Sequence, residues 1–191
     1  GYTLTLGAKY IIPSNATFTI EDTSSTGEGT ITGSGTWLIQ QGTSTTTGNT
    51  ILESGKLINT SNYYGVRVLT GTLTMNGGEI NSNGFTVYDE SEFVMNGGKV
   101  LGRTGLGLQV MDNATFELND GIIETDGDNV GINMHGNCSG VINGGEVIAL
   151  YDNGNEDGGA AITAFKNTTL TINGGTLHSV ANTLSGNGSI S

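Results

Sequence analysis

The chain has little of several residue types that common folds and partners require. Its 191 residues include one proline, one cysteine and six basic residues, against 18 Asp and Glu, for a net charge of −12. The lone Cys138 excludes an intrachain disulfide, and we interpret it as a small half-buried residue rather than a reactive thiol. The scattered basic residues form no patch that would follow phosphates, so we expect no nucleic-acid partner.

Long apolar runs are also missing. No segment approaches the roughly 20 apolar residues of a membrane-spanning helix, so we expect no membrane insertion. No signal-peptide pattern follows Gly1. We therefore expect the chain to be an excerpt of a longer protein with flanking domains.

Glycine, threonine and asparagine are abundant instead, with 33, 28 and 20 copies. All three are poor helix formers, and glycine costs about 1 kcal/mol at an interior helix position, which excludes a helical bundle. Hydrophobic positions nevertheless recur regularly, which disfavours disorder.

A short motif repeats along the chain. Asn-Gly-Gly, or Asn-Asp-Gly in one copy, occurs five times, with apolar residues alternating on both sides. The copies begin at Asn76, Asn96, Asn119, Asn143 and Asn173. Two fainter copies lie upstream, at residues 18–22 and 51–57. The alternation predicts a strand, a tight turn and a second strand, and a third short strand such as Phe85-Thr-Val87 precedes each motif.

Three short strands in each repeat are typical of one coil of a parallel β-helix, in which each strand pairs with its equivalent one coil on, roughly 4.8 Å away. We therefore predict an all-β, single-stranded right-handed parallel β-helix (a β-solenoid) of about seven coils. It would form one domain over residues 1–191, with residues 1–15 as an N-terminal cover, 16–180 as coils and 181–191 as a tail. A leucine-rich repeat lacks its required spacing here. An antiparallel hairpin meander would not explain why equivalent positions keep the same chemistry.

Alternation also predicts which side chains fill the lumen of the coils. We expect four apolar columns, each with one residue per coil. Their members are Val68, Val87, Val110, Met134 and Ala164; Leu73, Phe93, Phe116 and Leu170; Met75, Met95, Leu118, Ile142 and Ile172; and Ile80, Val100, Ile123, Val147 and Leu177.

The motif asparagines would stack above one another at one corner. Asparagine tolerates left-handed backbone angles, and stacked amides hydrogen-bond from coil to coil. The glycines that follow leave room for a sharp corner. We therefore interpret the five asparagines as a structural ladder rather than as a polar active site.

A second predicted column is charged. Three residues after the motif asparagine, or after its equivalent Glu53 in a fainter copy, Lys56, Glu79 and Lys99 would alternate in sign on neighbouring coils of an exposed face. We expect at most about 1 kcal/mol from each such pair.

Two acidic loops are candidates for binding calcium. The first contains Asp126 and Asp128, and the second contains Asp152, Asn155 and Asp157. The second loop imitates the first half of a calcium loop, but Ala164 stands where the closing Glu is needed. We favour solvated loops, so no cofactor is required and calcium is the only candidate ion.

A bulky column follows the first strand of successive coils and leans outward. It consists of Tyr88, Met111, His135 and Phe165, with Tyr151 in a nearby loop. Such a stripe on a rigid rod can stack on sugar rings. The alternative is that these side chains pack beneath a corner or a neighbouring loop.

These coils resemble the pectate-lyase-like (pectin-lyase-like) superfamily of right-handed β-helices, particularly Asn-Gly-Gly repeat regions of bacterial surface proteins of the adhesin type. The resemblance covers residues 16–180 and concerns the fold. It implies a secreted or cell-surface, extracellular protein. The superfamily includes polysaccharide lyases, glycoside hydrolases, phage tailspikes and non-catalytic carbohydrate-binding modules.

The patterns that the enzymatic members imply are missing from this sequence. Gly136 and Asn137 follow His135, so no Gly-His-Asp occurs, and there is no Asp-Asp pair. The outward positions of the first strands carry no acid–base pair of carboxylates. These positions are Arg67, Thr86, Gln109, Asn133 and Thr163.

The sequence therefore leads to three hypotheses about function. The first is a non-catalytic module that binds carbohydrate or a host-surface protein. The second is a polysaccharide lyase or hydrolase, or a phage tailspike fragment. The third is a purely structural spacer.

Overall fold

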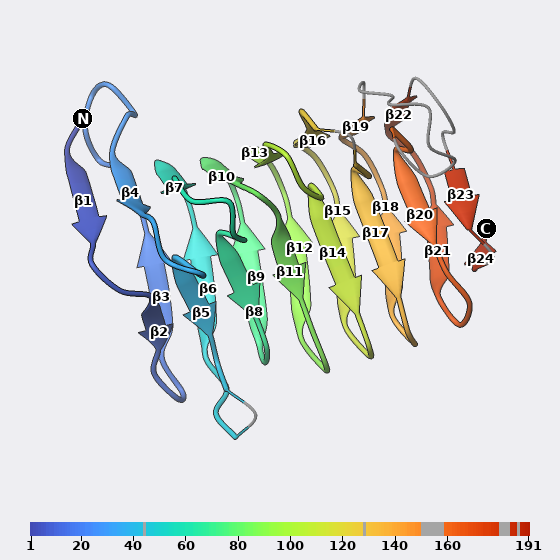
Figure 1. Cartoon of the computed structure of the whole chain (residues 1–191), viewed down its shortest axis with the longest axis horizontal. Coiled ribbons are helices and arrows are strands. Elements are labelled where there is room, and N and C mark those ends of the chain that lie inside the picture. Colours follow the sequence, from blue (N-terminus) through green and yellow to red (C-terminus); the bar gives the residue numbers. More distant parts are fainter. Residues whose placement is uncertain (44, 128, 150–158, 180–183, 187) are drawn as a thin grey trace.

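The computed structural model contains short β-strands and no helix in the residues that it describes, which are 1–43, 45–127, 129–149, 159–179, 184–186 and 188–191 (Figure 1). This part of the chain accordingly holds no helix with the length and apolar character to cross a bilayer. The strands are mostly three or four residues long and belong to three sheets of eight strands each.

Sheet A contains β1 (Thr3–Leu6), β4 (Thr30–Gly33), β7 (Lys56–Asn59), β10 (Glu79–Ser82), β13 (Lys99–Gly102), β16 (Ile122–Thr125), β19 (Glu146–Ala149) and β22 (Thr176–Ser179). Sheet B contains β2 (Tyr10–Ile12), β5 (Ile39–Gln41), β8 (Val66–Val68), β11 (Phe85–Val87), β14 (Leu108–Met111), β17 (Ile132–His135), β20 (Ile162–Ala164) and β23 (Leu184–Gly186). Sheet C contains β3 (Thr17–Ile20), β6 (Asn49–Leu52), β9 (Thr72–Met75), β12 (Glu92–Met95), β15 (Thr115–Leu118), β18 (Ser139–Ile142), β21 (Thr169–Ile172) and β24 (Ser189–Ile190).

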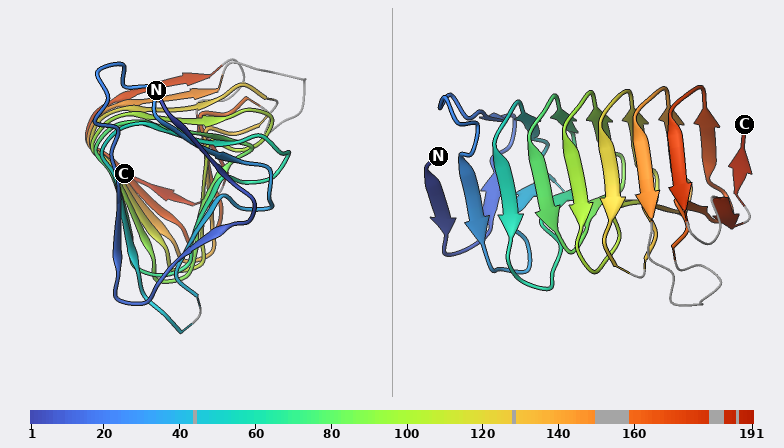
Figure 2. Two further views of the ribbon diagram at one scale, coloured as in Figure 1. Left: turned by 90° about the vertical axis from the view of Figure 1, so that its left-hand side faces the viewer. Right: turned by 90° about the horizontal axis from the view of Figure 1, so that it is seen from above.

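Every neighbouring pair within these sheets is parallel, and each strand pairs with the strand three places further along the chain, as with β9, β12 and β15. The end-on view shows the resulting triangular cross-section, and the side view shows the stack of coils (Figure 2). The predicted right-handed parallel β-helix is therefore confirmed. Strands β2 to β22 make seven coils of three strands, between β1 at one end and β23 and β24 at the other.

Both ends of the chain contribute strands to the stack. Within residues 1–15, expected to cover the first coil, β1 and β2 pair with β4 and β5. Within residues 181–191, expected to form a tail, β23 and β24 pair with β20 and β21.

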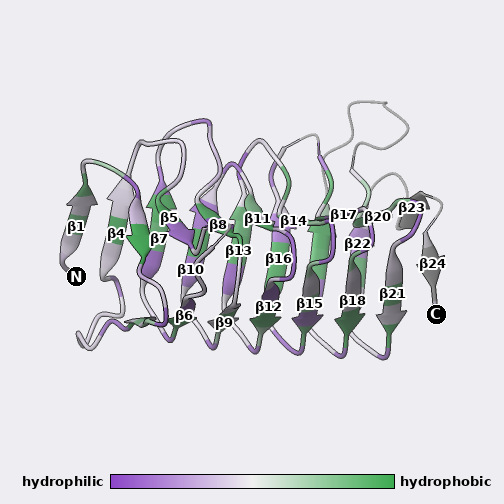
Figure 3. Ribbon diagram, turned by 90° about the horizontal axis from the view of Figure 1, so that it is seen from below, coloured by the Kyte–Doolittle hydropathy of each residue, from purple (hydrophilic) through white to green (hydrophobic). Residues whose placement is uncertain are grey.

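The lumen is filled as the alternation predicted. Of the predicted lumen residues, Ile172 and Leu177 are partly buried and the others are buried. Hydrophobic and hydrophilic colours alternate along the strands (Figure 3). A further lumen column begins the strands of sheet B, where the Phe85 ring meets Phe93 edge to face at 4.6 Å. Its buried members are Ile39, Val66, Phe85, Leu108, Ile132 and Ile162.

The motif asparagines form a continuous hydrogen-bonded stack at the corner between sheets C and A. Each Nδ2 donates to the Oδ1 of the asparagine one coil earlier, from Asn173 back to Asn76, at 2.8–2.9 Å. Asn76 in turn donates to Glu53. We expected the asparagine to adopt left-handed backbone angles. The second glycine after it adopts them instead; Gly98, for example, has φ = 87°. A Cβ on Gly98 would lie 2.6 Å from the carbonyl oxygen of Gly78, so close stacking also requires glycine.

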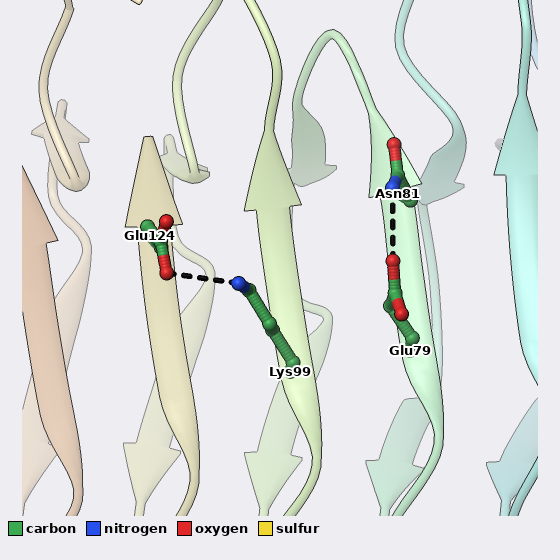
Figure 4. A network of polar contacts seen from close by, with 4 residues as sticks. All are labelled: Glu79, Asn81, Lys99 and Glu124. Carbon is green, nitrogen blue, oxygen red and sulfur yellow. Dashed lines mark hydrogen bonds and ion pairs between the residues drawn. The ribbon is translucent and has the colours of Figure 1, made fainter. Parts of the chain in front are cut away.

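The predicted charged column lies in register on sheet A, with Glu79 opposite Lys56 and Lys99. However, Lys99 Nζ pairs with Glu124 Oε2 at 2.9 Å (Figure 4). Glu124 lies on the strand of the next coil, two residues beyond the position opposite Lys99. Glu79 instead accepts a hydrogen bond from Asn81 in its own strand. The alternating column is correct, but the expected pair between Lys99 and Glu79 is not the one formed.

Candidate functional site

The outward side chains of sheet B form a polar row that runs along the rod. The register of neighbouring strands places one of them in each coil. In order along the rod they are Gln40, Arg67, Thr86, Gln109, Asn133 and Thr163. We call this row the floor, and the floor together with the aromatic side chains beside it the sheet B face.

The floor is unusually buried for the outer side of a sheet. Thr86 and Thr163 are 0 % exposed, and Asn133 is 9 % exposed. Thr86 Oγ1, Asn133 Oδ1 and Thr163 Oγ1 are buried and have no hydrogen-bond partner among the residues that the structure describes, and the same is true of Arg67 Nε. Such atoms are rare in folded proteins, because each one costs about 1–3 kcal/mol unless a polar group satisfies it. Four such atoms lie on this one face of the rod.

An aromatic cluster flanks the first part of the floor. The Trp37 and Tyr64 rings, from the loops that precede β5 and β8, stack 5.3 Å apart with an interplanar angle of 19°. The guanidinium of Arg67 lies over Trp37 at 5.1 Å and over Tyr88 at 5.0 Å. These four side chains are all partly exposed. They combine ring faces with a cation, whose attraction to the rings holds the guanidinium in place.

Tyr88 belongs to this cluster. Its phenol lies beside the floor, where burial raises its pKa and the cation of Arg67 opposes that rise. The hydroxyl therefore stays protonated near neutral pH and can act as a hydrogen-bond donor.

The rest of the predicted bulky column lies further along the same face. Met111 and His135 are in register on β14 and β17, and Phe165 directly follows β20. The His135 ring stacks on Phe165 at 4.2 Å and 18°. All three side chains are partly exposed, so they border the floor rather than pack fully beneath a loop. Tyr151 lies outside the described residues.

The acidic loops do not assemble a metal centre in the part of the chain that the structure describes, where no three His, Cys, Asp or Glu side chains group together. Asp126 is exposed, and desolvation together with the Glu124 carboxylate raises its pKa. Asp128, Asp152, Asn155 and Asp157 lie outside the described residues. Calcium binding at these loops stays a prediction.

The floor of the sheet B face is poor in charge. Within its described floor the only charged side chain is Arg67, and no carboxylate is present to act as nucleophile, acid or base. Glycoside hydrolysis ordinarily requires a pair of carboxylates. Ring faces and uncharged hydrogen-bonding groups, by contrast, suit the two sides of a sugar ring.

Alternation predicted the floor positions from Arg67 to Thr163 but not Gln40, and two further features of the site were not predicted. Trp37 was missed because the loops between sheets A and B differ in length and carry no repeated pattern. The burial of outward side chains was missed because a half-buried strand normally exposes them. A bulky residue near the end of several of these loops was the available signal.

Comparison of the chain with family models, curated proteins and solved structures gave no match. The sheet B face is therefore interpreted from its own geometry.

Proposed function

We propose that this chain is a non-catalytic β-solenoid module that binds glycan on the sheet B face. The supporting observation is the row of partly exposed aromatic rings beside a polar floor along one side of the rod. Rings stack on the apolar faces of sugars, and the partly exposed floor side chains Arg67 and Gln109 provide partners for hydroxyl groups. From Arg67 to Thr163 the floor spans four coil spacings, or about 19 Å, enough for a short oligosaccharide.

The architecture favours binding of an extended ligand. The floor residues are held by parallel sheets that run the length of the rod, so little ordering is needed when a ligand binds. A preorganised surface of this kind suits a stiff, repetitive polymer.

The biological setting belongs to the same proposal. We infer that the chain is part of a secreted or cell-surface bacterial protein, of the pectate-lyase-like β-helix type and with an adhesin role. The basis is the likeness of its coils to Asn-Gly-Gly repeat regions of such proteins.

Retention on polysaccharides tests the proposal. The wild-type chain is passed over immobilised insoluble polysaccharides of several compositions, beside the variants Tyr88→Ala and Phe165→Ala. Tyr2→Ala is the matched control, because Tyr2 is an aromatic residue that is 89 % exposed and precedes β1, away from the sheet B face. We expect wild type and Tyr2→Ala to be retained, and each face variant to bind about tenfold more weakly, as for the loss of one stacked ring.

Other outcomes would contradict the proposal. Equal retention of all four proteins would exclude the sheet B face as the site. Failure of the wild type to bind any polysaccharide would favour a structural spacer. Release of reducing or unsaturated sugar ends during incubation would show that the protein is an enzyme.

A further inference from the structure

Arg67 carries a positive charge that no acidic side chain among the described residues pairs with. The ion pair in the described part of the chain joins Lys99 to Glu124, so Arg67 has no acidic partner there. Its Nε is buried without an acceptor, while the guanidinium lies over two rings, Trp37 and Tyr88.

A second cation lies close to the same end of the floor. Lys9 Nζ donates a hydrogen bond to Gln40 Oε1 at 2.9 Å, and Gln40 is in register with Arg67 on the neighbouring strand. Lys9 also has no acidic partner among the described residues. A hollow of about 350 Å³ adjoins this position and is lined by Lys9, Thr36 and Trp37. Two cations and an open volume are therefore gathered at one end of the sheet B face.

The geometry of Arg67 suits an oxyanion. A guanidinium presents a planar fork of N–H donors that matches the two oxygens of a carboxylate or a sulfate. The Arg67 side chain is partly exposed, so a ligand can approach it from solvent. Partial burial strengthens the attraction relative to that in open water.

The remaining charge distribution limits how many anionic groups a ligand can carry. The next four floor residues, Thr86, Gln109, Asn133 and Thr163, are uncharged, and the whole chain has a net charge of −12. A densely charged polyanion would be repelled over most of its length. A single acidic group at the Arg67 end would not.

We propose that the end of the sheet B face formed by Lys9, Arg67 and Trp37 binds one oxyanion substituent, a carboxylate or a sulfate, on an otherwise neutral glycan. This rests on the proposed function. Arg67 is then the residue that selects the acidic sugar, while the rest of the face holds neutral sugars.

An array of paired oligosaccharides tests this inference, with members of each pair differing by one carboxylate or one sulfate ester. Binding is measured in EDTA, so that no divalent cation bridges ligand and protein. We expect the wild type to bind an acidic member about tenfold or more tightly than its neutral partner, as for charge-assisted hydrogen bonds. Separate carboxylate and sulfate arms identify which group is preferred.

Three variants locate the preference. Arg67→Gln should abolish it, so that acidic and neutral members of a pair bind equally, and Arg67→Lys should keep part of it, because the charge stays but the fork is lost. Lys56→Gln removes a cation from sheet A and should leave the preference unchanged. Circular dichroism confirms that each variant is folded.

The outcomes separate the two proposals. Equal binding of neutral and acidic members by the wild type, or an undiminished preference in folded Arg67→Gln, would overturn this inference and leave glycan binding intact. A wild type that binds no member of the array and no polysaccharide would overturn both.

Discussion

At the scale of single residues, Cys138 shows how position in a coil sets chemical behaviour. The side chain is 1 % exposed, and Sγ lies 3.4 Å from the carbonyl oxygen of Val110, to which it donates. Burial raises the pKa of the thiol to about 11. Because this lies above the ordinary value of 9.0, the folded state is not weakened by this group below pH 9 and loses stability as the pH rises from 9 towards 11.

We predict that Cys138 resists alkylation in the folded protein. At pH 8 only about one thiol in a thousand would be ionised, and the thiolate is the reacting species. Iodoacetamide should therefore label the native chain at least about a hundredfold more slowly than the chain in guanidinium chloride, as followed by mass spectrometry. Equal rates in the two states would show that the thiol is accessible.

At the scale of the strand, one lumen column contains a gap that its neighbour fills. Gly140 on β18 stands between Phe116 and Leu170, where the other described coils from β9 onward carry a large side chain. A Cβ at Gly140 would lie 1.9 Å from Cε1 of the Phe116 ring. The ring thus occupies the volume of two column positions, and the two residues must be considered together.

A double-mutant cycle tests this pairing. Gly140→Ala alone should destabilise the fold by about 1–3 kcal/mol, because the added Cβ would overlap the buried Phe116 ring and force it to shift. Combined with Phe116→Leu, the same substitution should cost at least about 1 kcal/mol less than in the wild-type background. Urea denaturation of the four proteins measures both values, and additive costs would contradict the proposed packing.

At the scale of the whole molecule, the lumen is closed along its length and open at its first coil. Leu4 on β1 shares a lumen column with Ile31 and Leu57, yet it is 57 % exposed whereas Leu57 is 1 % exposed. Tyr10, at the same end, is 40 % exposed. Equivalent positions therefore bury different areas according to how many coils cover them.

We predict a gradient of stability along the rod. Leu57→Ala should lower the free energy of unfolding by about 2–5 kcal/mol, as for a fully buried leucine. Leu4→Ala, at an equivalent position of the repeat, should cost less than about 1 kcal/mol, because most of its area is already in water. Equal losses in chemical denaturation would mean that the first coil is covered in solution.

The fold was predictable from the sequence because its determinants are local and repeated. Alternation such as Leu73-Thr-Met75 assigns each side chain to the lumen or the outside, and the glycines after Asn76 define the corner. When the same pattern recurs in every coil, an error in one copy does not change the architecture. The partner of Lys99 was less predictable, because a long side chain reaches several neighbours of opposite charge.

The sequence alone thus determined the parallel coils, the lumen columns, the asparagine stack and most of the floor positions. Each of these follows from two regularities: side chains alternate between lumen and outside along a strand, and each column takes one residue from every coil. The three-dimensional structure decided which floor atoms are buried, and it brought Trp37 and Tyr88 onto Arg67. Those contacts join side chains from loops and strands of three successive coils. Loops of unequal length carry no period, so their side chains find their places only when the coils stack.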